Sequence, residues 1–275
     1  MKNGCINIVC WLIIFAVVIH RTVLWFGWKF VLPATLILLV IIAFVYRNSI
    51  YVVMGQVTFT KNHEKGFSWF EKAYKSGRMK PQHALFYAYL LLRDGELEKS
   101  AKMIDEVGKN KKTSLTRQDF LNSRLNRALI QWKAGDRKKA IEMIQGLYDE
   151  GFITTALYGV LGYLYIEDGE YQKALKINKE ASEYNSTDLI IADNLALNYL
   201  MLDNFEISEK LYLELLEKNP DFIEPYYNYA TLLEKQGKKE EAIEFYKKAL
   251  TYKEKYLSTV SHKQIEEKIK NIEGI

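Results

Sequence analysis

A pattern of small residues recurs every 34 residues over the second half of the chain and constrains the fold more than any other feature. Its landmark is a glycine that is followed five residues later by alanine. The pairs are Gly135 and Ala140, Gly169 and Ala174, and Gly237 and Ala242, with looser versions at Gly95 and Ser100 and at Asp203 and Ser208. Taken as positions 15 and 20 of a unit, they place unit starts at Pro81, Leu121, Thr155, Leu189 and Ile223. Such a fixed period predicts an array of stacked repeats.

Other columns of the same frame align without adjustment. Position 8 of each unit holds a small residue, namely Ala88, Ala128, Gly162, Ala196 and Ala230. Small residues at positions 8 and 20 let two helices cross closely, and larger apolar residues at positions 24 and 27 fill the space between neighbours. The glycine at position 15 suits the turn between the helices. One further step back gives a degenerate unit that starts at Arg47.

Composition favours helices over strands. Hydrophobic residues make up 49% of the chain and charged residues 26%, which is typical of a folded protein. Four prolines and 15 glycines are few for an all-β chain of 275 residues, which needs a turn every 8 to 12 residues or so. Both cysteines lie inside the first apolar run and build no disulfide framework for the rest.

The repeating units resemble tetratricopeptide repeats. The best of them starts at Ile223 and carries Tyr226, Tyr229, Ala230, Leu233, Gly237, Ala242, Tyr246 and Ala249 at the family's signature positions. The resemblance implies an all-α, right-handed superhelical solenoid of six helix-turn-helix repeats over residues 47–256, with starts at 47, 81, 121, 155, 189 and 223. Departures are Asp203 at the turn glycine, Asn178 at an aromatic position, and six extra residues within 109–120. Apolar residues at helical spacing predict a C-terminal capping helix over residues 257–275.

Two apolar runs precede the array, at residues 5–19 and 30–46, and neither contains a charged side chain. At about 1.5 Å per residue each run nearly spans a hydrocarbon core of about 30 Å. Trp25 and Trp28 stand beside Arg21 and Lys29 between the runs, as at a membrane interface. We expect residues 1–46 to form a transmembrane helical hairpin whose second helix continues into the first repeat. A single span and a cleaved signal peptide are the alternatives.

Charge bears on the orientation of this anchor. Residues 1–153 hold 23 Lys and Arg against 12 Asp and Glu, a net charge of +11, whereas residues 154–275 hold 15 against 22, a net charge of −7. For a hairpin, the positive-inside rule places both ends and the repeat domain in the cytoplasm of a cell whose plasma or inner membrane holds the chain. With a single span the repeat domain lies outside.

In the family, the first helix of each unit lines a concave face through positions 2, 5, 9, 12 and 13, and this face takes protein or peptide ligands. The resemblance therefore implies a partner-binding groove. Its candidate residues are Leu85, Tyr89, Leu125, Leu129, Trp132, Tyr163, Ile166, Leu197 and Tyr227. The alternative is that these side chains pack between neighbouring helices. No unit carries Lys at position 5 with Asn at position 9, so the family's carboxylate clamp for chaperone tails is not expected.

Motifs for catalysis are absent from the sequence. The four histidines are scattered, and there is no phosphate-binding loop, dinucleotide fingerprint or nucleophile elbow. We expect no enzymatic activity, no cofactor and no metal. A basic cluster that includes Lys109, Lys111 and Lys112 is open to anionic lipid contact or to plain solvation, and nucleic acid is the less favoured ligand.

Two functions follow from these observations. The first is a membrane-anchored scaffold that binds a partner in the repeat groove. The alternative is a structural or assembly subunit of a membrane complex, in secretion, envelope assembly or polysaccharide export, without independent binding of soluble partners.

Overall fold

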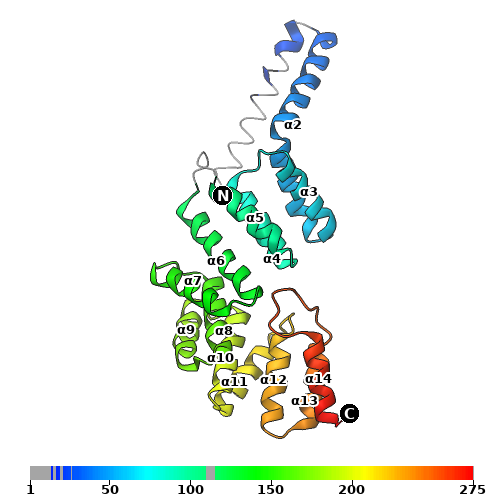
Figure 1. The fold of residues 1–275 in the computed structure, drawn as a ribbon. Helices are drawn as coiled ribbons and strands as arrows, with labels where there is room; N and C mark the ends of the chain where they lie inside the picture. The colour runs from blue at the N-terminus through cyan, green and yellow to red at the C-terminus, as the bar shows by residue number, and fades with distance from the viewer. Residues whose placement is uncertain (1–13, 15–16, 19–20, 26, 110–114, 275) are drawn as a thin grey trace. The chain divides into compact units, whose positions relative to one another are not determined.

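The computed structural model describes residues 14, 17–18, 21–25, 27–109 and 115–274, and every regular element in these ranges is a helix. The chain divides into two compact units, residues 1–83 and 84–275. Both consist of helices that pack as consecutive pairs (Figure 1). The expected all-α repeat solenoid is confirmed.

The first unit contains α2 (Trp28–Phe59) and α3 (His63–Lys75). Helix α2 has no break between the second apolar run and the first helix expected of the first repeat. Pro33 is the sixth residue of α2 and lies inside the helix, where it cannot donate a hydrogen bond to the Lys29 carbonyl four residues earlier. Of the described helices, α2 alone is long and apolar enough to cross a membrane. The first apolar run lies largely outside the described residues, so the expected hairpin partner of α2 is not described.

The second half of α2 packs against α3 through a narrow stripe. Asn48, Val52 and Gly55 are its buried residues there. The Asn48 amide nitrogen donates to the Ala73 carbonyl at 2.8 Å, which is the kind of partner that a buried polar group requires. A Cβ built on Gly55 would lie 2.9 Å from the Phe70 ring, so the two helices cross closely because this position lacks a side chain.

The second unit repeats this pairing, and the boundary with the first unit falls in the first turn of α4. Its helices are α4 (Pro81–Arg93), α5 (Leu97–Lys109), α6 (Arg117–Lys133), α7 (Arg137–Asp149), α8 (Thr155–Glu167), α9 (Tyr171–Tyr184), α10 (Leu189–Met201), α11 (Phe205–Leu216), α12 (Glu224–Lys235), α13 (Lys239–Ala249) and α14 (His262–Glu273). Helices α4, α8 and α10 begin at expected unit starts, and α12 begins one residue later. Helix α6 begins before its unit start because the end of the insertion extends it.

The turns between paired helices explain the glycine column. Gly95, Gly135, Gly169 and Gly237 have φ between +80° and +95°, a left-handed conformation that costs glycine little. Asp203 occupies the same position with φ of +55°. The sequence departure therefore keeps the turn but uses a residue for which the conformation is less favourable.

Two units carry serine in place of alanine at position 20, and each serine hydroxyl forms a hydrogen bond. Ser100 Oγ donates to the Ala88 carbonyl at 2.7 Å, and Ser208 Oγ donates to the Ala196 carbonyl at 2.9 Å. In both units the acceptor is the residue at position 8 of the facing helix. The small-residue column is thus compatible with serine because its hydroxyl satisfies a bond across the helix crossing.

Asn178 departs from the aromatic pattern because its neighbour at position 8 is glycine. A Cβ on Gly162 would lie 1.9 Å from Asn178 Oδ1, so the asparagine fills the space that alanine has in other units. The Asn178 amide nitrogen donates to Asn198 Oδ1 at 3.1 Å, and Asn194 Nδ2 donates to the Gly159 carbonyl at 2.7 Å. This buried asparagine network joins α8 and α9 to α10.

The C-terminal helix is shorter than predicted. Residues 257–261 belong to the connection between α13 and α14, and α14 begins at His262. The reason is a capping box, in which Ser261 Oγ accepts from the Gln264 N–H while the Gln264 side chain accepts from the Ser261 N–H. Ile265 and Ile269 are buried, which is consistent with α14 covering the end of the array.

Candidate partner-binding surface

The first helices of the repeats, α4, α6, α8, α10 and α12, carry all the predicted groove residues. We call the surface formed by positions 2, 5, 9, 12 and 13 of these helices the inner surface. The five aliphatic candidates are buried, each 5–6% exposed: Leu85, Leu125, Leu129, Ile166 and Leu197. The four aromatic candidates, Tyr89, Trp132, Tyr163 and Tyr227, are half-buried. Packing between helices, the alternative given above, accounts for the burial of the aliphatic group, and the aromatic side chains form the accessible part.

Trp132 and Tyr163 lie together at the centre of the inner surface. Their ring centroids are 5.8 Å apart in an edge-to-face arrangement, a geometry that stabilises aromatic pairs. Trp132 Nε1 donates to Glu167 Oε2 at 3.0 Å, which fixes the indole on the neighbouring helix. Burial raises the pKa of the Tyr163 phenol above its usual range, so this hydroxyl stays protonated as a donor.

Lys133, next to Trp132 at the end of α6, is a half-buried cation that the predicted set omitted. Its ammonium lies 4.5 Å from the Trp132 ring centroid and 5.6 Å from that of Tyr256. Burial lowers the pKa of Lys133, while the carboxylates of Glu167, Glu224 and Glu254 oppose this shift. The position is 13 of its unit, one of the lining positions that the family pattern indicates.

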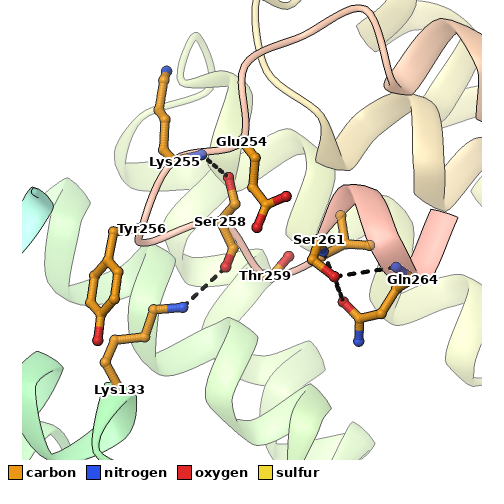
Figure 2. Close-up of a pocket in the computed structure, with 9 residues that line it drawn as sticks. Lys133, Glu254, Lys255, Tyr256, Ser258, Thr259, Ser261 and Gln264 are labelled. Atoms are coloured by element: carbon orange, nitrogen blue, oxygen red, sulfur yellow. Dashed lines mark hydrogen bonds between the residues drawn. The ribbon is translucent and has the colours of Figure 1, made fainter. Parts of the chain in front are cut away.

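The connection between α13 and α14 crosses the inner surface. We call residues 254–261 the docked segment. The Lys133 ammonium donates to the Ser258 carbonyl at 3.0 Å, and the Thr259 N–H donates to Glu224 Oε1 at 2.8 Å. Val260 is only 6% exposed. Figure 2 shows the Lys133 side chain reaching the Ser258 carbonyl beside a pocket of about 350 Å³.

Tyr227, the last aromatic candidate, lies near the C-terminal end of the array. Its ring centroid is 5.4 Å from that of Tyr246. The Tyr246 hydroxyl donates to Glu234 Oε2 at 2.7 Å, and Lys268 of α14 donates to the same carboxylate. The structure therefore brings Tyr227 into a polar contact region with α14, apart from the Trp132 pair.

Asp193, at position 5 of α10, is a buried carboxyl group on this side of the array. It is 4% exposed, and Asn228 Nδ2 of α12 donates to its Oδ1 at 3.1 Å. Burial raises the pKa of Asp193 to about 8, the bond from Asn228 acts in the opposite direction, and the nearby Glu224 raises it further. The group carries a proton through much of the neutral range.

Three arginines that follow the lysines of the basic cluster in the chain form ion pairs within it. Arg124 forms an ion pair with Glu150 at 2.6 Å, Arg127 with Asp105, and Arg137 with Asp168 at 3.0 Å. Lys109 ends α5, while Lys111 and Lys112 lie outside the described residues. Anionic lipid contact near these lysines stays a prediction. Within the described ranges, no group of three or more His, Cys, Asp or Glu residues could hold a metal ion.

Comparison with known proteins identifies the repeat. A sequence profile described as Tetratricopeptide repeat matches residues 211–244, from the middle of α11 to the middle of α13. Those residues match the tetratricopeptide repeat family, and the fold of the chain is that of a tetratricopeptide repeat array. A tetratricopeptide repeat protein from Parabacteroides merdae superposes with a TM-score of 0.63 at 15% identity, over 83% of this chain and 85% of that chain. A thermophilic tetratricopeptide repeat protein from Thermus thermophilus gives 0.55 at 18% identity, over 71% and 100%.

One curated relative adds a partial match. The human protein O-mannosyl-transferase TMTC2 is 32% identical over 101 residues, which are 36% of this chain and 12% of that protein. The tetratricopeptide fold supports a protein–protein interaction scaffold and is typically non-catalytic. The name of the human protein is that of a transferase, but the match spans only about an eighth of its length.

Proposed function

We propose that this chain is a membrane-anchored scaffold that binds a partner protein or peptide on the inner surface of its tetratricopeptide repeats. The observation that carries the proposal is the division of α2 into two environments. Its first half has an apolar surface that the described residues leave uncovered, and its second half is a repeat helix.

The apolar half of α2 has the properties of a lipid-facing helix. Phe30 is 74% exposed, Leu36 67% and Val40 62%, and residues 30–46 contain no charged side chain. A soluble helix has one apolar stripe that faces its core, whereas this stretch is apolar all round. Exposed apolar area of this extent favours a membrane environment. The second half, by contrast, buries a residue every three or four positions against α3.

The orientation follows from the flanking charges. If residues 5–19 form a second span, the N-terminus, Lys2, Arg47, Lys61 and Lys65 share one side, and Arg21 and Lys29 the other. The positive-inside rule then places the repeats in the cytoplasm. If α2 is the single span, the repeats lie outside. A reporter fused after Ile275 that is active only in the cytoplasm distinguishes the two arrangements.

The partner contacts the aromatic part of the inner surface. Trp132 and Tyr163 are half-buried, with ring edges held in place by Glu167 and by each other. Rigid aromatic side chains contribute a large share of interface energy because they bury much area at a small entropic cost. We therefore assign these two residues as the centre of the contact.

Photo-crosslinking in intact cells tests the proposal. A photoreactive amino acid replaces Tyr163 in the full chain, and a matched variant carries it at Tyr184, which is 53% exposed at the end of α9. We expect a discrete intermolecular adduct in the membrane fraction from position 163 and none from position 184. Identical adduct patterns from both positions would contradict binding on the inner surface, and adducts found only in the soluble fraction would contradict anchoring.

A further inference from the structure

One peptide group of the docked segment forms hydrogen bonds with two oppositely charged side chains of the inner surface. The Ser258 carbonyl and the Thr259 N–H belong to the same peptide bond. Lys133 of α6 donates to the carbonyl at 3.0 Å, and Glu224 at the start of α12 accepts from the N–H at 2.8 Å. We call Lys133 and Glu224 the peptide clamp. Both positions, 13 and 2 of their units, belong to the inner surface.

The peptide clamp contacts only backbone atoms of Ser258 and Thr259, so these two bonds do not depend on the side chains of those residues. Bonds that involve an ionised partner are shorter and stronger than neutral ones. Burial lowers the pKa of Lys133, and Glu167 and Glu254 as well as Glu224 act to keep the ammonium charged. The cation is thus both partly desolvated and surrounded by carboxylates, which favours a directed contact over a solvated one.

Side chains on either side of the gripped peptide group make the specific contacts. The Lys133 ammonium lies over the Tyr256 ring. The same ring packs against the turn at Gly95, where a Cβ would lie 2.9 Å from the ring. The Thr259 hydroxyl lies beside Tyr163, and Val260 is buried. The sequence Tyr256-Leu-Ser-Thr-Val260 therefore places an aromatic residue, a hydroxyl and an aliphatic residue on the inner surface in that order.

We propose that residues 254–261 are an intramolecular ligand of the inner surface, and that this surface takes a peptide whose turn presents one peptide group to Lys133 and Glu224. The expected partner is a segment with an aromatic residue before the gripped peptide group and an aliphatic residue after it. This partner class rests on the proposed function. A tethered segment competes at an effective concentration in the millimolar range. A partner peptide therefore binds well only when the docked segment leaves the inner surface.

Hydrogen exchange of the Thr259 amide tests the docking itself in the full chain in detergent micelles. Lys133→Ala and Glu224→Ala should each raise its exchange rate by at least about tenfold, since each removes a charge-assisted bond. The matched controls are Lys173→Ala and Glu170→Ala, an exposed pair on α9 and its cap, which should leave the rate unchanged. The Ile265 amide in α14 should stay protected in all four variants, and Glu224→Gln, which keeps an acceptor, should lie between wild type and Glu224→Ala.

A labelled peptide with the sequence of residues 253–261 tests the ligand class. Thr259→Pro removes the gripped N–H and releases the docked segment, so this variant should bind the peptide at least about tenfold more tightly than wild type. Adding Lys133→Ala should abolish the gain. If the peptide binds wild type and Thr259→Pro equally well, or binds neither of them, the proposal is overturned. So does an unchanged Thr259 exchange rate in the clamp variants. Protection of Thr259 does not depend on any partner, so it can hold even if crosslinking at position 163 fails.

Discussion

At the scale of single residues, two departures from the repeat pattern, Asn178 and Gly162, are coupled to each other. Asn178 and Gly162 are each unusual for their columns, and the structure shows that one occupies the space which the other leaves. Column-by-column comparison identifies both departures but treats them as independent. Their link could not be predicted, because it depends on the distance between two helices and not on the pattern along either.

Gly162→Ala should destabilise the chain. The new Cβ would lie 1.9 Å from Asn178 Oδ1, so the buried asparagine network has to shift, and overpacking of this kind costs about 1–3 kcal/mol. Gly146→Ala in α7 is the matched control, because nothing lies within 4 Å of its Cβ, and it should be neutral or gain up to ~1 kcal/mol. Urea unfolding of the solubilised chain measures both, and equal midpoints for the two variants would contradict the account.

Asp193 should make stability depend on pH. Its pKa is about 8 in the folded chain, against about 3.9 in an unfolded one, so between these values the folded state binds the extra proton. The free energy of unfolding should therefore fall as pH rises from about 4 to 8. Asp193→Asn should flatten this slope, and Asp188→Asn at the N-cap of α10 should retain it. Thermal unfolding between pH 5 and pH 8 gives the comparison, and parallel slopes for all three chains would rule out the assignment.

At the scale of elements, the sequence predicts the helices well and the contacts between distant segments poorly. The paired helices follow from local signals, since α8 and α10 begin at the residues that the 34-residue frame indicates. The docked segment does not. Residues 257–261 carry apolar residues at helical spacing, and their place beside Lys133 depends on a contact between segments far apart in the chain. The capping box at Ser261 is the local signal that could have revealed the later helix start.

The same limit applies to the candidate site. The aliphatic and aromatic residues on the first helices share positions 5, 9 and 12, so the sequence alone could not separate buried side chains such as Leu197 from accessible ones such as Trp132. The difference depends on side-chain size. The large aromatic rings extend beyond the helix contact that covers the aliphatic groups.

The turn between α10 and α11 should be a weak point of the array. Asp203 adopts φ of +55°, which costs a non-glycine residue roughly 1 kcal/mol, and its ion pair with Lys235 is exposed and contributes little. Asp203→Gly should therefore raise the free energy of unfolding by up to ~1 kcal/mol. Gly169→Ala at the equivalent turn, where φ is +80°, should lower it by a similar amount. A lower denaturation midpoint for Asp203→Gly would show that the aspartate stabilises the turn.

At the scale of the whole molecule, one continuous helix connects two kinds of surface. Helix α2 begins with side chains that suit lipid and ends with side chains that pack against α3. In the proposed arrangement, the first repeat is joined to the membrane segment by a continuous helix and not by an unstructured linker. The proposed scaffold function depends on this attachment.

Cysteine accessibility along α2 tests the membrane anchor most directly. Single cysteines replace Leu36, Val40, Val53 and Val57 in a full chain whose Cys5 and Cys10 are serine, and open membrane fragments are treated with a water-soluble maleimide. All four native side chains are exposed in the structure, so packing does not distinguish them. We expect positions 53 and 57 to react at once and positions 36 and 40 to react only after detergent is added. Equal labelling at all four positions in the intact bilayer would contradict the account.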